Sequence, residues 1–487
     1  MKVFFINPPF KAEYGKFSRE NRSPAITRSG TLYYPLWLIY AAALCEKDGF
    51  EVEFLDAPTV PMSEEESLCE IIKRGEGTRL FVIETSTPSI YSDIAFMEKV
   101  KKEFSQAVFV LVGTHVSALP DETLGLSKLI DAVTRREYDY TIREIARCLK
   151  NNRNWHEVKG ITYRDGDKII SNADMDYIEN LDEIPFAAEF IKNHLNYKDY
   201  FFAGSYYPEI QLFTGRGCPA RCNYCVYPQT MHGHTYRLRS AQNVVEEFQY
   251  IAENFPDVKH IVIEDDTFTA KIDRVISICN MLIEKGINKK LKWLCNARVN
   301  NLNLETMKLM KKAGCRQIIP GVESGNQIIL NNIKKGITLK QIDEYVKNAK
   351  KAGLLVHACY MVGNKGETKE TMLKTLELAL KLNTDAAQFY PLLPFPGTEA
   401  YSWAKENNYI KGDYSDYVKM DGTINCVLEL PELSSDDMVS FCDYARKKYL
   451  LRIRYIIHRL WVGLGDFEDL KRSFKAFWNI KKYLLKK

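Results

Sequence analysis

The sequence predicts an α/β protein with two successive domains of alternating strands and helices and a helical C-terminal region. The chain of 487 residues is longer than one hydrophobic core usually organises. Short apolar runs alternate with helical patterns in residues 1–150, and again from residue 208 to about 395. We therefore expect domains at 1–150 and 208–400, a hairpin and linker at 151–207 between them, and a basic helical region at 401–487.

The first domain is predicted to be a doubly wound parallel sheet. Its expected strands are 3–6, 52–55, 80–83, 108–112 and 130–133, and its expected helices include 35–48 and 141–149. Loops rich in Gly, Ser and Thr follow the third and fourth strands, at 85–89 and 113–116. Loops in this position allow a phosphate or nucleotide to approach the backbone closely. Ser and Thr also form ordinary turns there, and that alternative stays open.

The second domain is predicted to be a partial barrel. Before it, residues 157–172 are predicted to form a hairpin. Its six expected strands are 209–213, 260–263, 292–295, 317–320, 356–361 and 386–390. Its expected helices are 240–254, 271–285, 304–313, 338–352 and 367–382. Six strands with helical patterns between them indicate an open (β/α)6 arrangement rather than a complete eight-stranded barrel.

The composition indicates a cytoplasmic protein. Nine of the twelve cysteines are scattered singly through apolar runs, which is typical of reduced thiols rather than of a disulfide framework. The longest apolar run, residues 32–45, is too short to span a bilayer. Residues 1–6 are predicted to form a strand, since they lack the features of a signal peptide.

The chemistry is expected at three cysteines that follow the first strand of the second domain. Cys218, Cys222 and Cys225 are spaced so that three thiolates on one loop can bind three irons of a 4Fe–4S cluster. The fourth iron then keeps an open position for a substrate. A zinc site completed by His232 or His234 is the alternative, but it needs a fourth ligand and leaves the barrel unexplained.

This motif resembles the signature of the radical S-adenosylmethionine (SAM) superfamily, with Tyr224 as the aromatic residue before the last cysteine. The resemblance implies that the open iron binds SAM and that one electron cleaves SAM to a 5′-deoxyadenosyl radical. In such enzymes the cofactors perform the chemistry, and the protein positions and shields them. An electron donor such as flavodoxin or ferredoxin is implied as a partner.

Further candidates for SAM binding follow the next three strands of the predicted barrel. The resemblance implies roles in binding SAM for Glu264, Asp265, Arg298, Glu323 and Ser324. Acidic residues at strand ends are also frequent helix caps, so Glu264, Asp265 and Glu323 each have a purely structural alternative.

The first domain resembles the B12-binding domain that precedes the barrel in many radical SAM enzymes. The similar segments are 6–9, 34–44, 85–89, 112–124 and 136–146. The resemblance implies a cobalamin site that includes Ser86, Thr87 and Gly113. The usual Asp-x-His-x-x-Gly motif is absent from the sequence, and the spacing of His115 does not fit it. Cobalamin bound without that histidine, and a fold that has lost cobalamin, both stay open.

A narrower resemblance is to the cyclitol ether synthases of hopanoid biosynthesis. The similar segments include 84–89, 112–120, 227–240, 264–269 and 321–336. This implies the rearrangement of a sugar-like headgroup on a lipid-linked polyol, for which His232, His234 and Tyr236 are candidate contacts. Equally, these three side chains are candidates for fixing the cysteine loop. A cobalamin-dependent radical SAM C-methyltransferase is the alternative, and a non-catalytic iron–sulfur or zinc-binding protein is the third.

The C-terminal segment is strongly basic. Residues 446–487 contain 13 Lys or Arg and 3 Asp or Glu, while the whole chain has a net charge of +4. Residues 449–461 and 474–485 mix apolar and basic side chains as interfacial helices do on anionic lipid, which predicts peripheral contact with the inner membrane face. Core-packing helices with basic outer faces are the alternative. We expect no nucleic acid partner, because the sequence shows no RNA-binding module.

Overall fold

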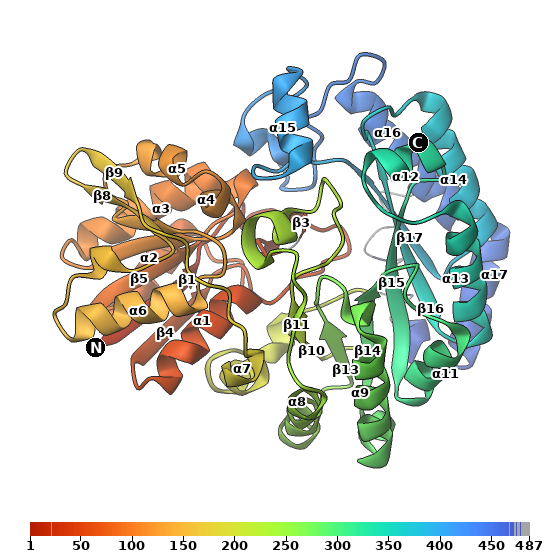
Figure 1. Ribbon diagram of the computed structural model, residues 1–487, viewed down its shortest axis with the longest axis horizontal. Coiled ribbons are helices and arrows are strands. Elements are labelled where there is room, and N and C mark those ends of the chain that lie inside the picture. The colour runs from red at the N-terminus through yellow and green to blue at the C-terminus, as the bar shows by residue number, and fades with distance from the viewer. Residues whose placement is uncertain (21, 467, 472–473, 475–477, 479–487) are drawn as a thin grey trace.

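The computed structural model describes residues 1–20, 22–466, 468–471, 474 and 478, and it confirms the predicted α/β class. Figure 1 shows two sheets side by side, the N-terminal one in red to yellow and the second in green to blue. The loop that carries the three cysteines lies between them.

The first sheet has seven strands. In sheet order they are β4 (Glu51–Asp56), β1 (Lys2–Asn7), β5 (Thr78–Glu84), β6 (Val108–Val112), β7 (Ala132–Thr134), β8 (Ile161–Asp165) and β9 (Lys168–Ser171). The first five run parallel, as predicted. The predicted hairpin, β8 and β9, is not a separate connector, because β8 pairs antiparallel with β7 and extends the first sheet.

Helices cover both faces of this sheet, which confirms the doubly wound arrangement. On one face Val3 and Phe5 pack in the same core as α1 (Leu36–Lys47) and α6 (Asp139–Lys150). On the other face Phe4 and Ile6 pack with α2 (Glu64–Arg74) and α3 (Ile90–Glu103). Neighbouring residues of β1 belong to different cores because successive side chains of a strand point to opposite faces of the sheet. The shorter elements here are β2 (Phe17–Ser18), β3 (Ala25–Ile26), α4 (Thr114–Ala118), α5 (Pro120–Leu126) and α7 (Ala187–His194).

The second sheet confirms the partial barrel. Its six parallel strands are β10 (Glu209–Leu212), β13 (His260–Ile263), β14 (Lys292–Ala297), β15 (Cys315–Glu323), β16 (Leu355–Val362) and β17 (Ala386–Pro391). They follow one another in chain order, and β10 and β17 form the two edges, so the barrel is open. The connecting helices are α8 (Ala241–Asn254), α9 (Ile272–Glu284), α10 (Ile287–Lys290), α11 (Leu304–Lys312), α12 (Gln327–Asn332), α13 (Leu339–Lys351) and α14 (Lys369–Leu382).

The C-terminal region is helical, with α15 (Glu399–Glu406), α16 (Ser435–Leu450) and α17 (Ile453–Leu464). The buried side chains Cys442, Ala445 and Tyr449 of α16 join the core of the barrel. Most of the second predicted basic segment, 474–485, lies outside the described residues. Within the described part of the chain, no helix is both long enough and apolar enough to cross a membrane.

The carboxyl edges of the two sheets face each other. Ser117, after β6, donates to the Thr230 carbonyl at 2.7 Å, and the hydroxyl of Tyr227 donates to the Glu20 carbonyl at 2.8 Å. Arg216 donates two hydrogen bonds to Asp139, at 2.8 and 3.0 Å, and both side chains are buried. A charge removed from water is tolerated only when it is paired, so this ion pair ties the second domain to the start of α6.

We expect Arg216→Met to lower the free energy of unfolding by about 3–5 kcal/mol, because Asp139 would remain as an unpaired buried charge. Urea denaturation of the full chain measures this loss. Lys334→Met is the control, since it removes an exposed ion pair with Glu399 and should cost less than about 1 kcal/mol. Equal losses in the two variants would show that the Arg216 ion pair does not hold the domains together.

Candidate functional site

The three cysteines lie on a loop closed at its base by two short strands. β11 (Gly215–Arg216) pairs antiparallel with β12 (Arg237–Leu238), and residues 217–236 between them form what we call the cluster loop. Cys218 and Cys222 are buried, and Cys225 is half-buried. The loop follows β10, so it lies at the carboxyl edge of the barrel, where parallel sheets bind ligands.

The start of the cluster loop requires glycine. Gly217 has a φ of 90°, and a Cβ atom there would lie 2.2 Å from the Thr235 carbonyl oxygen. Only glycine combines this left-handed backbone with so close an approach. The amide of Cys218 in turn donates to the Gly233 carbonyl at 3.4 Å. The two ends of the loop are therefore held together directly beside the first cysteine.

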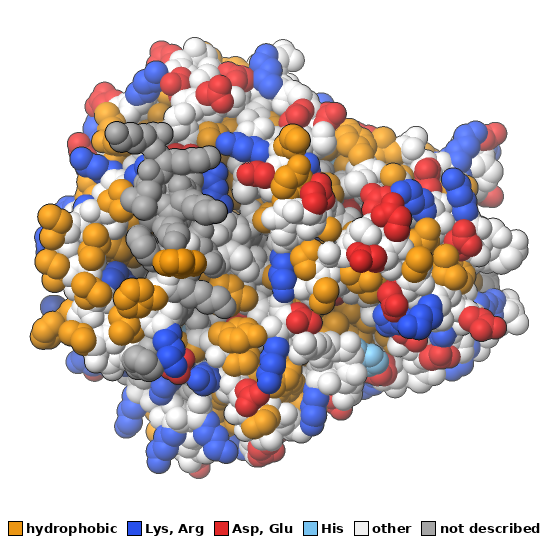
Figure 2. Space-filling view, turned by 180° about the vertical axis from the view of Figure 1, so that it is seen from behind, with side chains coloured by type: hydrophobic (Ala, Val, Ile, Leu, Met, Phe, Trp, Pro, Cys, Tyr) orange, Lys and Arg blue, Asp and Glu red, His pale blue; other side chains and the backbone are white. Residues whose placement is uncertain are grey.

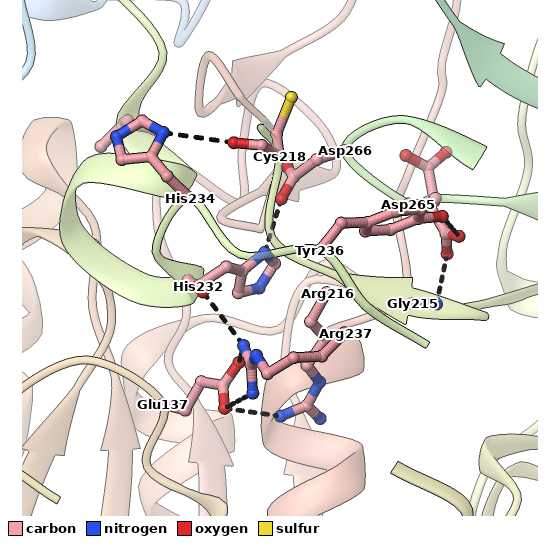
Figure 3. Close-up of polar contacts among 12 residues, drawn as sticks. Glu137, Gly215, Arg216, Cys218, His232, His234, Tyr236, Arg237, Asp265 and Asp266 are labelled. Atoms are coloured by element: carbon pink, nitrogen blue, oxygen red, sulfur yellow. Dashed lines mark hydrogen bonds and ion pairs between the residues drawn. The ribbon is translucent and has the colours of Figure 1, made fainter. Parts of the chain in front are cut away.

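Asp265, which follows β13, anchors both ends of this loop (Figure 3). Its carboxylate accepts hydrogen bonds from the Thr214 amide and hydroxyl, both at 2.6 Å, from the Gly215 amide at 3.1 Å, and from the Tyr236 hydroxyl at 2.9 Å. Burial raises the pKa of Asp265, and the positive charge of Arg274 and the hydrogen bonds from Thr214 and Tyr236 oppose that effect. The contacts favour a positioning role for Asp265 over the predicted direct contact with SAM.

The two histidines of the loop are also engaged in its structure. His232 Nδ1 donates to Asp266 Oδ2 at 2.7 Å, and the His232 ring lies on Trp37 of α1, 3.9 Å between ring centroids. His234 Nδ1 donates to the Ala220 carbonyl at 2.9 Å. Tyr236 donates to Asp265, as described above. These contacts favour a role in fixing the cluster loop over polyol binding for His232, His234 and Tyr236.

The donor set suits an iron–sulfur cluster. Cys218, Cys222 and Cys225 lie together on the cluster loop, and the thiolates that hold a 4Fe–4S cluster each bind a different iron. Among the described residues, no three His, Cys, Asp or Glu side chains are grouped around one metal position.

Three charged side chains lie beside the cysteines: Arg298 after β14, Glu323 at the end of β15, and Lys335 after α12. Arg298 Nη1 is 3.9 Å from the Cys222 sulfur, and its Nη2 donates to the Lys335 carbonyl at 2.6 Å. Glu323 accepts from the Tyr224 hydroxyl at 2.9 Å and from Lys335 Nζ at 2.7 Å. Burial lowers the pKa of Lys335, but the Glu323 carboxylate and the Cys222 thiolate together raise it, and the net shift is upward. The cationic side chains of Arg298 and Lys335 therefore lie beside the cluster loop.

Glu264 and Ser324, the remaining SAM candidates, differ in their surroundings. Glu264 Oε2 lies 3.4 Å from Arg22 Nη1, a residue of the first domain, and burial raises the pKa of Glu264. Ser324 is fully buried, with its hydroxyl 3.2 Å from that of Thr375 and accepting from the Asn326 amide. Glu264 thus lies at the domain boundary, whereas Ser324 stabilises a turn.

Sequence reasoning missed Arg22 and Lys335 as members of this group. Arg22 also reaches Asp266 at 3.6 Å, across 244 positions of sequence, and no local pattern signals such a contact. Lys335 lies in the segment 321–336, which resembles the hopanoid enzymes, but the sequence does not show that its ammonium contacts Glu323 and Tyr224.

The candidate cobalamin residues lie at the facing edge of the first sheet. The hydroxyls of Ser86 and Ser89 are 2.7 Å apart, and the Thr87 hydroxyl is 3.2 Å from His115 Nδ1. Gly113 has a φ of 121°, and a Cβ atom there would lie 2.4 Å from the Thr85 carbonyl oxygen, so close packing alone accounts for this glycine.

His115 gives this edge an unsatisfied polar atom. Its Nε2 is buried and has no hydrogen-bond partner in the described structure, and burial lowers its pKa to about 3. A neutral imidazole with an open nitrogen, beside several hydroxyls, fits a polar cofactor such as cobalamin. The cobalamin roles of Ser86, Thr87 and Gly113 themselves stay predictions.

Comparison with known proteins identifies both domains. Residues 212–379 match the family model of the radical SAM superfamily, and residues 22–146 match that of the B12 binding domain. These matches confirm the expected cofactors, namely a 4Fe–4S cluster, SAM and cobalamin.

Two curated relatives align with most of the chain. An uncharacterized methyltransferase of Pyrococcus horikoshii is 30% identical over 483 residues, covering 99% of this chain and 98% of its own. The anaerobic magnesium-protoporphyrin IX monomethyl ester cyclase of Cereibacter sphaeroides is 25% identical over 437 residues, covering 88% of this chain and 69% of its own.

A solved structure has the same fold. The radical SAM methyltransferase TsrM from Kitasatospora setae superimposes with a TM-score of 0.69 at 15% identity, covering 91% of this chain and 88% of its own. The likeness includes both domains, since nearly the whole chain is aligned.

We expect Asp265→Asn to reduce the iron and sulfide bound per chain after anaerobic reconstitution, because one acceptor oxygen of the loop anchor becomes a donor that faces other donors. Metal analysis of the purified protein measures this. Asp273→Asn, an exposed position at the start of α9, is the matched control and should bind as much iron as the unsubstituted chain. Full iron and sulfide content in Asp265→Asn would contradict the anchoring role.

Proposed function

Because the chain belongs to the radical SAM superfamily and carries a B12-binding domain, we propose that it is a cobalamin-dependent radical SAM methyltransferase. Two kinds of support favour this activity over the others. They are the contacts between the two domains beside the cluster loop, and the end-to-end similarity, at 30% identity, to an uncharacterized methyltransferase.

The observation that carries the proposal is the contact between the two carboxyl edges. The cluster loop touches the loops that follow the strands of the first sheet, through Ser117 with Thr230 and through Tyr227 with Glu20. SAM at the cluster and cobalamin on the facing edge would then share one region between the domains. Methyl transfer to an unactivated carbon requires that a radical source and a methyl carrier both reach one substrate.

The chain's own residues would bind and orient these groups. Cys218, Cys222 and Cys225 hold the cluster, and Arg298 and Lys335 place positive charge beside its thiolates. We assign SAM binding to Glu264, Arg298 and Glu323, whose carboxylates and guanidinium suit the amino, carboxylate and ribose groups of SAM. When bound, SAM and the reduced cluster supply the 5′-deoxyadenosyl radical, and cobalamin carries the methyl group.

The other expected activities have less support. Neither relative named above is a cyclitol ether synthase, so the expected headgroup rearrangement is not the function we propose. The ring cyclase is less similar and is matched over 69% of its own length, whereas the methyltransferase is matched over 98%. A non-catalytic role leaves the superfamily match unexplained.

The test is anaerobic reconstitution with iron, sulfide, cobalamin, SAM and dithionite. The unsubstituted chain should form 5′-deoxyadenosine, and Cys222→Ala should lower its rate at least about a hundredfold, since the cluster loses a ligand. Cys69→Ala, an exposed cysteine on α2, is the control and should keep the full rate. Full activity in Cys222→Ala would refute the cluster assignment.

A second experiment tests whether the methyl group of SAM is transferred to a product. With SAM labelled in its methyl group and an extract of cellular metabolites, the cobalamin-loaded chain should transfer the label to a carbon of a product. Formation of 5′-deoxyadenosine together with an unlabelled, rearranged product would leave the superfamily chemistry intact and refute methyl transfer.

A further inference from the structure

Helix α17 (Ile453–Leu464) presents its apolar side chains to solvent. The exposed residues recur at helical spacing, with exposed fractions between 45% and 79%: Ile453, Ile456, Ile457, Leu460, Trp461 and Leu464. This spacing places all six on one face of the helix. Further along the chain, Phe474 and Trp478 are also more than 60% exposed. Figure 2 shows hydrophobic side chains gathered on the face of the molecule that carries this end of the chain.

The opposite, polar face of α17 is the one that binds the barrel. The Tyr455 hydroxyl donates to the Asp385 carbonyl at 2.9 Å, and His458 Nε2 lies 2.9 Å from Asp385 Oδ1. Arg459 pairs with Asp469, which is fully buried and also pairs with Arg316. An ordinary surface helix buries its apolar face and exposes its polar face. Since α17 has the reverse orientation, its exposed face is unexplained by the packing of the described residues.

The charge around this face is positive. α17 contains no Asp or Glu, and Lys448 and Arg454, next to and within it, are exposed. The described residues 446–466 and 468–471 include seven Lys or Arg and three Asp or Glu. A second copy of the chain would bring one basic segment against another, which is repulsive. An apolar stripe with a tryptophan, flanked by basic residues, instead matches the headgroup region of an anionic bilayer.

We propose that α17 is an interfacial helix through which the protein docks on an anionic lipid surface. The helix would lie in the plane of the bilayer, with its six apolar side chains among the acyl chains and its basic neighbours at the phosphates. The polar contacts with Asp385 hold the helix to the barrel in the orientation that this requires. This inference does not depend on the methyl transfer proposed above.

The docking face lies at the opposite end of the barrel from the cysteines. Asp385 directly precedes β17, and Arg316, which pairs with Asp469, lies at the start of β15. The cluster loop and Glu323 are at the other ends of the strands. A protein docked through α17 would therefore keep the region between its two domains directed away from the lipid, so the contact localises the enzyme rather than covering its site.

Flotation of the reconstituted full chain with vesicles tests the proposal. The protein should float with vesicles that contain phosphatidylglycerol, bind phosphatidylcholine vesicles much less, and be released by salt. The double variant Ile457→Glu, Trp461→Glu should reduce binding to phosphatidylglycerol vesicles at least about tenfold, since two apolar side chains become charged. Both positions are exposed, so formation of 5′-deoxyadenosine in the absence of vesicles should be unchanged.

Met420→Glu is the matched control, because Met420 is 75% exposed but lies outside the helix, and its vesicle binding should equal that of the unsubstituted chain. Three results would overturn the proposal. They are no binding of the unsubstituted chain to phosphatidylglycerol vesicles, equal binding by the double variant, and a dimer in solution that the double variant converts to a monomer without any vesicle binding.

Discussion

The carboxylate of Asp265 is the contact on which the functional region depends. Its four hydrogen bonds come from Thr214 and Gly215 before the cluster loop and from Tyr236 at its end. A buried carboxylate without hydrogen-bond donors would destabilise the folded protein. The donors therefore stabilise the charge of Asp265, and Asp265 in turn holds the two ends of the cluster loop in place. The three cysteines are therefore held by the edge of the barrel, not by local turns alone.

The first domain contributes to the same region. Arg22 reaches Glu264 and Asp266 at the carboxyl edge of the barrel, and Trp37 packs on His232 of the cluster loop. Arg216, at the base of the loop, is paired with Asp139 of α6. Because each of these contacts joins the two domains, the cluster loop and the B12-binding edge form one structural unit. The cofactor regions that we propose therefore face each other.

The sequence predicted the regular elements well and the long-range contacts poorly. Each buried parallel strand is a short apolar run followed by a turn, and that pattern is local, so β1, β5, β13 and β16 were placed almost correctly. Which strand a hairpin joins is not local, and the pairing of β8 with β7 was therefore missed.

The cysteine spacing likewise identified the cluster loop, but it could not distinguish side chains that meet a ligand from those that hold the loop. Asp265 and Ser324 show this most clearly, because the Thr214 hydroxyl that bonds to Asp265 and the Thr375 hydroxyl beside Ser324 come from other parts of the chain. The basic tail was recognised from its composition. Only the fold shows that α17 binds the barrel with its polar face and leaves its apolar face exposed.

The most direct measurement of the central claim is whether the methyl group of SAM moves to the protein-bound cobalamin. The chain would be reconstituted anaerobically with the cluster and cobalamin, treated with a low-potential reductant that brings the cobalt to its cobalt(I) state, supplied with SAM carrying a labelled methyl group, and freed of small molecules. We predict that label remains with the cobalamin-loaded protein and is absent when cobalamin is omitted. If 5′-deoxyadenosine forms but no label is retained with cobalamin present, the chain is a radical SAM enzyme that does not transfer methyl groups in this way.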